Sequence, residues 1–151
     1  MAASTGGNTR AMAEGCPFCE VIAGAAGAAK VVDEERVVAF LDTSPVFKGH
    51  VLVVPRAHHE TLVDVPEELL APLFRTVQRV QRAIVDALGA QGTFVAANNT
   101  VSQSVPHLHV HVVPRTKGDG LRGFFWPRVK YDSTDDYEDH AARLRAALPA
   151  R

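Results

Sequence analysis

Residues 107–112 read His107-Leu108-His109-Val110-His111-Val112, so that three histidines alternate with aliphatic residues. Side chains alternate between the two faces of a β-strand, and a strand here presents all three imidazoles on one face, about 6.6 Å apart along the backbone. The aliphatic residues then face a protein core. A half-buried sheet normally varies the residues on its polar face, so the repeated histidine indicates chemistry rather than a merely solvated surface.

The segments around this strand predict an α+β fold, in which an antiparallel sheet of about five strands packs against one long helix and a short C-terminal helix. The long helix begins after Asp64, which caps it together with Glu67, and ends at Gly89. Between these signals, apolar residues recur every three or four positions and form one stripe for packing. The predicted strands are residues 31–32, 37–41, 49–55, 93–97 and 108–113, and the short helix covers residues 135–148 with Thr134 as its cap.

A chain of 151 residues fits a single domain. Residues 1–14 are small and polar, which predicts a flexible N-terminal tail. Residues 15–118 contain the predicted strands and the long helix and form the domain core. Residues 119–151 form a C-terminal extension, which we expect to pack on the domain or on a dimer partner.

The composition excludes several classes of protein. Sixteen basic and seventeen acidic residues give a formal net charge of -1, which provides no general attraction to nucleic acid polymers or anionic membranes. The chain has no apolar run of about 18 residues, and its N-terminus lacks the apolar core of a signal peptide, so we expect a cytoplasmic protein. Its two cysteines, Cys16 and Cys19, are more typical of a metal site or a thiol pair than of a structural disulfide.

The histidine strand alone supports two kinds of chemistry. Alternate strand residues can present imidazole nitrogens to one transition metal ion, although no carboxylate lies nearby in sequence to complete such a site. Alternatively, one imidazole is a nucleophile, because its ordinary pKa of about 6.5 leaves it largely neutral at pH 7, while its neighbours donate hydrogen bonds to a phosphate. The spacing does not choose between the two.

Three parts of the chain resemble a known family. They read Cys16-Pro17-Phe18-Cys19-Glu20-Val21-Ile22-Ala23-Gly24; Leu41-Asp42-Thr43-Ser44-Pro45 with Lys48-Gly49-His50-Val51-Leu52-Val53-Val54-Pro55-Arg56-Ala57-His58; and Gln103-Ser104-Val105-Pro106 followed by His107-Leu108-His109-Val110-His111-Val112-Val113-Pro114-Arg115. The last is similar to the histidine-triad (HIT) signature, the second to another block of that family, and the first to the start of its bacterial members with an N-terminal CxxC.

The resemblance implies an enzyme that binds purine nucleotides and cleaves a bond at the α-phosphorus, in a nucleoside phosphoramidate or a dinucleoside polyphosphate. The reaction passes through a nucleotidyl-histidine, in which His109 is the nucleophile. The resemblance implies that the catalytic residues are His109, His111, Ser104 and His107, and that the nucleotide-binding residues are Asp42, His50, Asn98 and Gln103. It does not identify the leaving group.

The resemblance also implies a structural zinc ion and no organic cofactor. Its ligands are Cys16, Cys19, His58 and His107, with His59 as an alternative to His58. Four protein ligands leave no open position for water, so this zinc would stabilise the fold rather than activate a nucleophile.

In the family, the long helix and the adjacent strand form a dimer interface, which implies a homodimer. The aromatic cluster Phe124-Phe125-Trp126 lies where family members vary their substrate preference, although simple core packing would account for it equally well.

Two rival hypotheses remain. The first is a noncatalytic nucleotide-binding or metal-binding protein, in which the histidines only hold a ligand. The second is a metal-dependent hydrolase that uses the three histidines of the triad as metal ligands.

Overall fold

The computed structural model describes residues 12–121 and 128–150, and the chain divides into two compact units between Asp119 and Gly120. The first unit contains the sheet and two helices, and the second contains one helix. Most of the predicted N-terminal tail and the whole Phe124-Phe125-Trp126 cluster lie outside the described residues.

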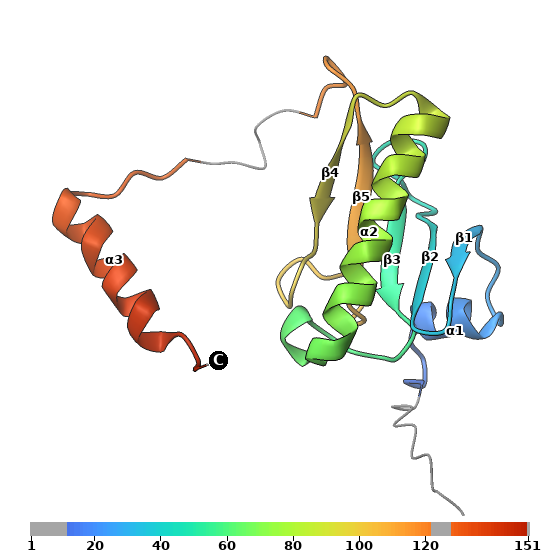
Figure 1. Cartoon of the computed structure of the whole chain (residues 1–151), viewed down its shortest axis with the longest axis horizontal. Coiled ribbons are helices and arrows are strands. Elements are labelled where there is room, and N and C mark those ends of the chain that lie inside the picture. The colour runs from blue at the N-terminus through green and yellow to red at the C-terminus, as the bar shows by residue number, and fades with distance from the viewer. Residues whose placement is uncertain (1–11, 122–127, 151) are drawn as a thin grey trace, which may run out of the picture. The chain divides into compact units, whose positions relative to one another are not determined.

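Five antiparallel strands form one sheet in the order β1-β2-β3-β5-β4 (Figure 1). The strands are β1 (Lys30–Asp33), β2 (Val37–Leu41), β3 (Val51–Pro55), β4 (Gly92–Ala96) and β5 (Val110–Arg115). The predicted α+β fold with a five-stranded antiparallel sheet is therefore confirmed. β5 lies between β3 and β4, so the histidine segment leads into the interior of the sheet rather than to its edge.

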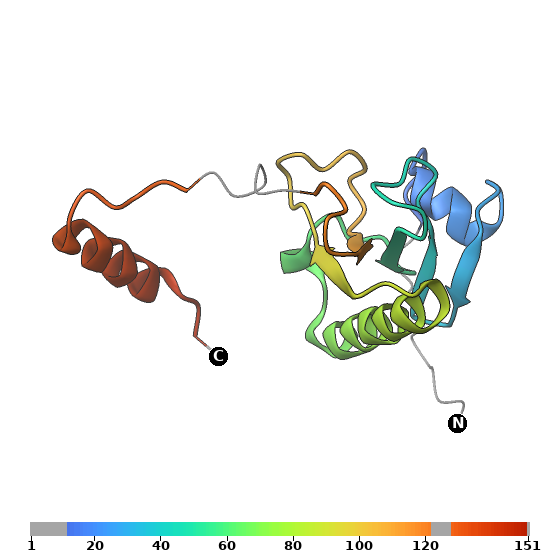
Figure 2. The same ribbon diagram turned by 90° about the horizontal axis from the view of Figure 1, so that it is seen from above.

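The long helix α2 (Glu67–Leu88) covers one face of the sheet (Figure 2). Its apolar stripe is buried against every second residue of β2, β3 and β5, as alternation along a strand requires. The buried stripe consists of Leu69, Leu73, Val77, Val80 and Ile84. On β5 and just before it, Leu108, Val110 and Val112 belong to this core.

A second apolar cluster lies on the opposite face, beneath the short helix α1 (Pro17–Ala23). Val21 and Ile22 of this helix pack there against Phe40 of β2 and Leu52 of β3. His111 pairs with Leu52 across the sheet and therefore faces the same side. The sheet thus separates the α2 core from a face shared by α1 and the histidines.

Some caps and boundaries of the predicted elements are wrong, and β3, for example, begins at Val51 rather than at residue 49. Asp64 does not cap α2, because its carboxylate accepts hydrogen bonds from the backbone and hydroxyl groups of Thr61 and so caps the single 3-10 turn Leu62–Asp64. Pro66 occupies the N-cap of α2 instead. β5 begins at Val110 rather than at residue 108, because the backbone N–H of Leu108 donates to the carbonyl oxygen of His59 outside the sheet.

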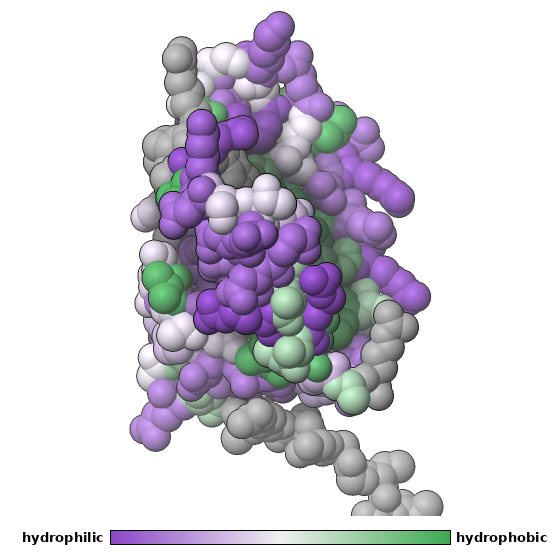
Figure 3. Space-filling model, turned by 90° about the vertical axis from the view of Figure 1, so that its left-hand side faces the viewer, coloured by the Kyte–Doolittle hydropathy of each residue, from purple (hydrophilic) through white to green (hydrophobic). Residues whose placement is uncertain are grey.

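The second unit contains α3 (Thr134–Ala147). Its cap is Ser133, one residue before the predicted cap, and the Ser133 hydroxyl oxygen accepts from the backbone N–H of Asp136 at 3.1 Å. No residue of this helix is buried. Figure 3 shows a face of the molecule on which hydrophilic residues predominate. Packing of the C-terminal extension on the domain or on a partner stays a prediction.

None of the helices in residues 12–121 and 128–150 combines the length and the apolar character needed to cross a bilayer.

Candidate functional site

The histidine rings lie on the α1 side of the sheet, where Phe18 packs against them. The Phe18 ring meets the His107 ring edge-on at a centroid distance of 6.0 Å and the His109 ring at 5.0 Å. The rings of His109 and His111 are 4.8 Å apart. Pro17 starts α1 with a backbone angle suited to a first helical turn, which fixes the position of Phe18 over the histidines.

His109 is held by a hydrogen bond within the histidine segment itself. Its Nδ1 lies 2.8 Å from the carbonyl oxygen of His107. A carbonyl oxygen can only accept, so in the neutral ring Nδ1 carries the proton and Nε2 carries a lone pair. Within the described residues Nε2 has no hydrogen-bond partner, although the side chain is only 2% exposed. This geometry leaves one oriented nitrogen available as a nucleophile.

His111 contacts His50, which in turn lies beside Asp42. Nε2 of His50 and Nδ1 of His111 are 2.9 Å apart, and Nδ1 of His50 is 3.6 Å from a carboxylate oxygen of Asp42. Burial lowers the pKa of His111 to about 4, and the nearby imidazoles of His109 and His50 act in the same direction. Burial also lowers the pKa of His50. Both rings are therefore neutral near pH 7.

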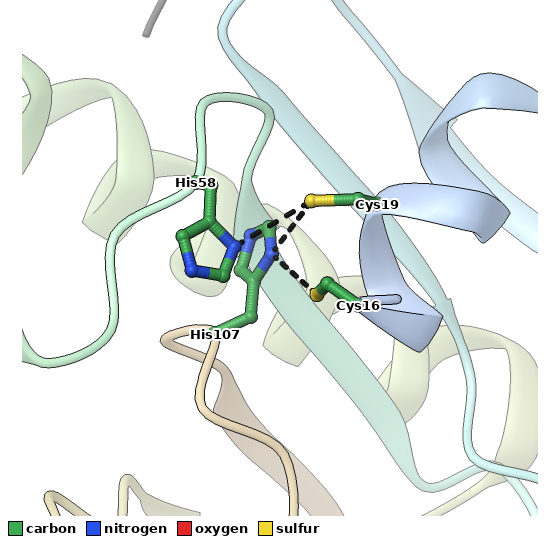
Figure 4. Close-up of side chains that lie close together, drawn as sticks. All are labelled: Cys16, Cys19, His58 and His107. Carbon is green, nitrogen blue, oxygen red and sulfur yellow. Dashed lines mark hydrogen bonds between the residues drawn. The ribbon is translucent and has the colours of Figure 1, made fainter. Parts of the chain in front are cut away.

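A second cluster joins residues from both ends of the domain (Figure 4). Cys16 and Cys19 flank the start of α1, His58 follows β3, and His107 precedes β5, yet their ligand atoms all lie within 4.8 Å of one another. His58, rather than the alternative His59, supplies the ring to this cluster.

The distances within this cluster match a tetrahedral metal site. Cys16 Sγ lies 3.5 Å from His107 Nδ1, and Cys19 Sγ lies 3.5 Å from His58 Nδ1 and 3.6 Å from His107 Nδ1. Zinc bonds of about 2.3 Å to sulfur and about 2.0 Å to nitrogen separate two such ligands by about 3.5 Å in a tetrahedron. The Cys2His2 cluster therefore fits a metal ion such as zinc.

His107 Nε2 donates to the carbonyl oxygen of Pro55 at 2.9 Å. This bond leaves Nδ1 as the nitrogen that faces the sulfur atoms, which is the usual arrangement of a metal-binding histidine and its supporting acceptor. His107 consequently contributes to two parts of the site. Its ring belongs to the Cys2His2 cluster, and its backbone carbonyl oxygen holds the ring of His109.

The loop before the histidines is anchored by the side chain of Gln103. Its Oε1 accepts from the backbone N–H of Thr100 at 2.9 Å, and its Nε2 donates to the carbonyl oxygen of Glu60 at 2.6 Å. Thr100 and Ser102 have left-handed backbone angles, with φ of 69° and 59°. A loop held in such uncommon angles depends on anchors of this kind.

The remaining predicted residues lie along the same loop. Ser104 and Asn98 are exposed. The neighbouring Asn99 accepts from the backbone N–H of Leu62 at 2.7 Å through its side-chain oxygen. The structure therefore brings Asp42, His50 and His111 together, while Asn98, Ser104 and Gln103 belong to the adjoining loop.

Two contributors to the site were not predicted. The first is Phe18, which lies between the two cysteines of the CxxC sequence. This location was the signal that could have placed its ring beside the histidines. The backbone N–H of Val46 donates to His50 Nδ1 at 3.2 Å, and no side-chain pattern reveals such a contact.

Comparison with known proteins identifies the domain. The HIT domain family model matches residues 24–118. The Protein hit of Bacillus subtilis is 43% identical over 129 residues, which cover 83% of this chain and 86% of that protein. A crystal structure of a HIT family member from Bacillus subtilis superimposes with a TM-score of 0.82 at 35% identity and covers 91% of this chain and 100% of that one.

Other relatives have more specific names. The adenosine 5'-monophosphoramidase of Schizosaccharomyces pombe is 32% identical over 74% of this chain and 83% of its own length. An adenylylsulfatase of Arabidopsis thaliana is 32% identical over 70% of this chain and 55% of its own length. A zinc-bound histidine triad family protein from Mycobacterium smegmatis superimposes with a TM-score of 0.68 at 34% identity and covers 89% of this chain and 98% of that one.

The match to the family model covers the sheet, the long helix and the histidine segment, and Cys16 and Cys19 lie beside the histidines as the bacterial pattern requires. The chain therefore belongs to the histidine-triad (HIT) family and is of the bacterial type with an N-terminal cysteine pair.

Proposed function

We propose that this chain is a nucleotide hydrolase or transferase that cleaves a bond at the α-phosphorus through a nucleotidyl intermediate on His109. The observation that carries the proposal is the hydrogen bond from His109 Nδ1 to the carbonyl oxygen of His107, because it leaves Nε2 unprotonated and oriented. A neutral imidazole nitrogen attacks phosphorus without first losing a proton.

In the first step His109 Nε2 forms a bond to the α-phosphorus, while the bond from phosphorus to the leaving group breaks. The leaving group departs with the bonding electron pair and gains a proton from solvent. In the second step a water oxygen attacks the same phosphorus and gives up one proton to solvent, the P–N bond breaks, and Nε2 recovers its lone pair as the nucleoside monophosphate leaves. An acceptor other than water would make the second step a transfer.

The neighbours of His109 supply electrostatic stabilisation. His111 and Ser104 donate hydrogen bonds to the nonbridging oxygens or to the leaving group, where charge develops in the transition state. His107 contributes its backbone carbonyl, which fixes the tautomer of His109. In this proposal the residues that act on the phosphate therefore all belong to the histidine segment and to the loop before it.

The nucleotide-binding residues in this proposal are Asp42, His50, Asn98 and Gln103. The partly buried carboxylate of Asp42 is suited to accept hydrogen bonds from the ribose hydroxyls of a purine nucleotide. The phosphoramidase and the adenylylsulfatase among the relatives support adenosine phosphoramidates and adenylyl sulfate as candidate substrates, and dinucleoside polyphosphates are a third candidate.

The metal in this proposal is zinc, held by Cys16, Cys19, His58 and His107. Bound zinc would supply structural stability, since four protein ligands close its coordination sphere. The tetrahedral spacing of the sulfur and nitrogen atoms supports this assignment, as does the zinc-bound relative.

The proposed assembly is a homodimer through α2 and β4. β4 is an edge strand of the sheet, and an edge strand offers unpaired backbone groups for association. A groove of about 430 Å³ lies between these two elements, and Phe74 and Val95 on its walls are 41% and 37% exposed. Exposed apolar side chains that share one groove favour an interaction site.

The test compares the wild-type chain with His109→Asn. The asparagine amide retains a donor for the His107 carbonyl oxygen but offers no nucleophilic nitrogen. We expect adenosine phosphoramidate hydrolysis to fall by at least about 10³-fold in kcat, while AMP binding by calorimetry changes little. The matched control is His140→Asn, at an exposed histidine of α3, which should keep wild-type turnover.

A second measurement identifies the intermediate directly. Wild-type protein quenched during turnover of an α-labelled phosphoramidate should carry an acid-labile label on His109, and His109→Asn should carry none. The wild-type chain could instead bind AMP without hydrolysing the phosphoramidate and without carrying the label. That result would contradict an enzyme and support a noncatalytic nucleotide-binding protein.

A further inference from the structure

His50 is enclosed by groups that use both of its ring nitrogens. Its side chain is 3% exposed. The backbone N–H of Val46 donates to Nδ1 at 3.2 Å, and Nε2 lies 2.9 Å from Nδ1 of His111. A bound nucleotide would have to break one of these hydrogen bonds to reach the ring, so a direct contact is not the role this geometry favours.

The backbone contact fixes the direction of the hydrogen bonds. A backbone N–H only donates, so the Nδ1 that receives the Val46 hydrogen bond carries a lone pair. In a neutral ring the proton is then on Nε2, which donates to Nδ1 of His111. His111 in turn holds its own proton on Nε2, the nitrogen that has no hydrogen-bond partner in the described part of the chain.

If the hydrogen bond between the two imidazoles ran the other way, from His111 to His50, the neutral His50 ring would carry its proton on Nδ1. That nitrogen would then have to donate to Asp42. These atoms are 3.6 Å apart, which is too long for a hydrogen bond, and the other oxygen of Asp42 already accepts from the backbone N–H of Ser44 at 2.8 Å. A doubly protonated ring is disfavoured as well, since burial lowers the pKa of His50 and lowers that of His111 to about 4.

The same distances argue against a second metal centre. Asp42, His50 and His111 have ligand atoms within 4.8 Å of one another. An ion among them would have to replace the hydrogen bond between the two imidazoles and the one from Val46. The group is therefore organised as a hydrogen-bonded chain.

We infer that His50 is a positioning residue, which holds His111 in the tautomer with its proton on Nε2 so that His111 is a ready hydrogen-bond donor to the substrate phosphate or leaving group. This inference rests on the proposed function for what His111 donates to. His50 was predicted to bind the nucleotide. In this inference it does so indirectly, by positioning His111.

The experiment reads the tautomer without any substrate. Long-range ¹H–¹⁵N NMR of histidine-labelled protein, assigned with His111→Asn, should show His111 Nε2 as the protonated nitrogen and Nδ1 as the unprotonated one. In His50→Gln the side-chain amide can still donate to His111 Nδ1, and the tautomer should persist. In His50→Leu, of similar bulk but without a donor, we expect a mixture of the two tautomers.

Kinetics give the second readout. In a mixture of tautomers only a fraction of His111 carries its proton on Nε2, so kcat should fall by about that fraction, roughly two- to tenfold. His50→Leu should show this loss with KM changed by less than about threefold, and His50→Gln should recover most of kcat. A role confined to packing would not be rescued by glutamine in preference to leucine.

A further variant covers the case in which His50→Leu does not fold. Val46→Pro removes the backbone donor at an exposed position without touching the histidines, and it should also produce mixed tautomers.

The inference is overturned if wild-type His111 carries its proton on Nδ1, or if folded His50→Leu retains the wild-type tautomer. Where His50→Leu does not fold, retention of that tautomer in Val46→Pro overturns it. A wild-type chain with the expected tautomer but no turnover would contradict the proposed function and still support the link from His50 to His111.

Discussion

His107 donates from Nε2 to the carbonyl oxygen of Pro55 at 2.9 Å, and this bond turns its other nitrogen toward the sulfur atoms of Cys16 and Cys19. The side chain of His107 is completely buried, so its ring is held in one orientation. The orientation of this ring therefore fits the Cys2His2 cluster for a metal ion.

Removal of the metal should lower stability. A ligand present at about 1,000 times its Kd stabilises the folded state by about 4 kcal/mol, which for a chain of this size corresponds to a Tm shift of about 10 °C. Calorimetry before and after chelation, with metal content measured on the same samples, should show this fall and its reversal on adding zinc.

Cys19→Ser is the matched control for chelation, since it should start at the lower Tm and respond little to the chelator. An unchanged Tm after complete metal removal would refute a structural metal. Loss of turnover at an unchanged Tm would instead indicate a metal-dependent hydrolase.

Gln103→Ala should weaken the loop that leads into the histidines. It removes two hydrogen bonds, each worth about 1 kcal/mol, and the second of them ties this loop to the carbonyl oxygen of Glu60. We expect kcat/KM for a phosphoramidate to fall by about tenfold, with the free energy of unfolding lowered by about 1 to 2 kcal/mol in urea titrations.

Gln103→Glu separates the two contacts, because its carboxylate still accepts from Thr100 but cannot donate to Glu60. An intermediate activity is expected from this variant. Wild-type kcat/KM in Gln103→Ala would exclude both a substrate contact and an anchoring role for the side chain.

Acid should destabilise the fold through His111. Its folded-state pKa of about 4 lies below the ordinary value of 6.5, since burial and the rings of His109 and His50 outweigh the opposing charge of Asp42. The unfolded chain therefore binds more protons between these two pH values. The free energy of unfolding should decrease as pH falls from 6.5 to about 4, and this contribution should level off below that range.

Urea denaturation at a series of pH values measures this slope. His111→Asn removes one titrating group and should flatten the profile by up to about 1.4 kcal/mol per pH unit. An identical slope in wild type and variant would show that His111 is not the group that takes up the proton.

Phe74→Arg should disrupt the proposed dimer, because it places a charge on the wall of the groove between α2 and β4. Analytical ultracentrifugation should then find the mass of one chain where the wild type has the mass of two. Val63→Arg, at a position that is 93% exposed and does not line the groove, should leave the assembly unchanged. A wild-type monomer at micromolar concentration would contradict the proposal.

Much of the fold could be predicted because its signals are local and strong. The apolar stripe from Leu69 to Ile84 and the Gly89 terminus define α2, and the alternation around His109 defines the approach to β5. α1 was not predicted, although Pro17 in its first turn and Gly24 in a left-handed conformation at its end are ordinary helix signals. Asp64 was predicted to cap α2, but its carboxylate instead accepts hydrogen bonds from the nearer Thr61.

The site was less accessible to sequence reasoning. Cys16 lies 91 residues from His107, so no local pattern joins them, and only a family resemblance predicted that they meet. The contact between Val46 and His50 is made by a backbone N–H, which every residue except proline possesses. Tautomers fixed in this way are determined by the folded backbone and leave no signature in residue identity.

The distribution of the Cys2His2 ligands has a consequence for biosynthesis. During translation the cysteines leave the ribosome first, and His107 follows only after β1 to β4 and both helices of the first unit have been made. A nascent chain therefore lacks a complete ligand set until more than two thirds of it exists. The proposed metal therefore gains its fourth ligand only after His107 has been synthesised, and a chain truncated before this residue would leave the two thiols without their shared imidazole partner.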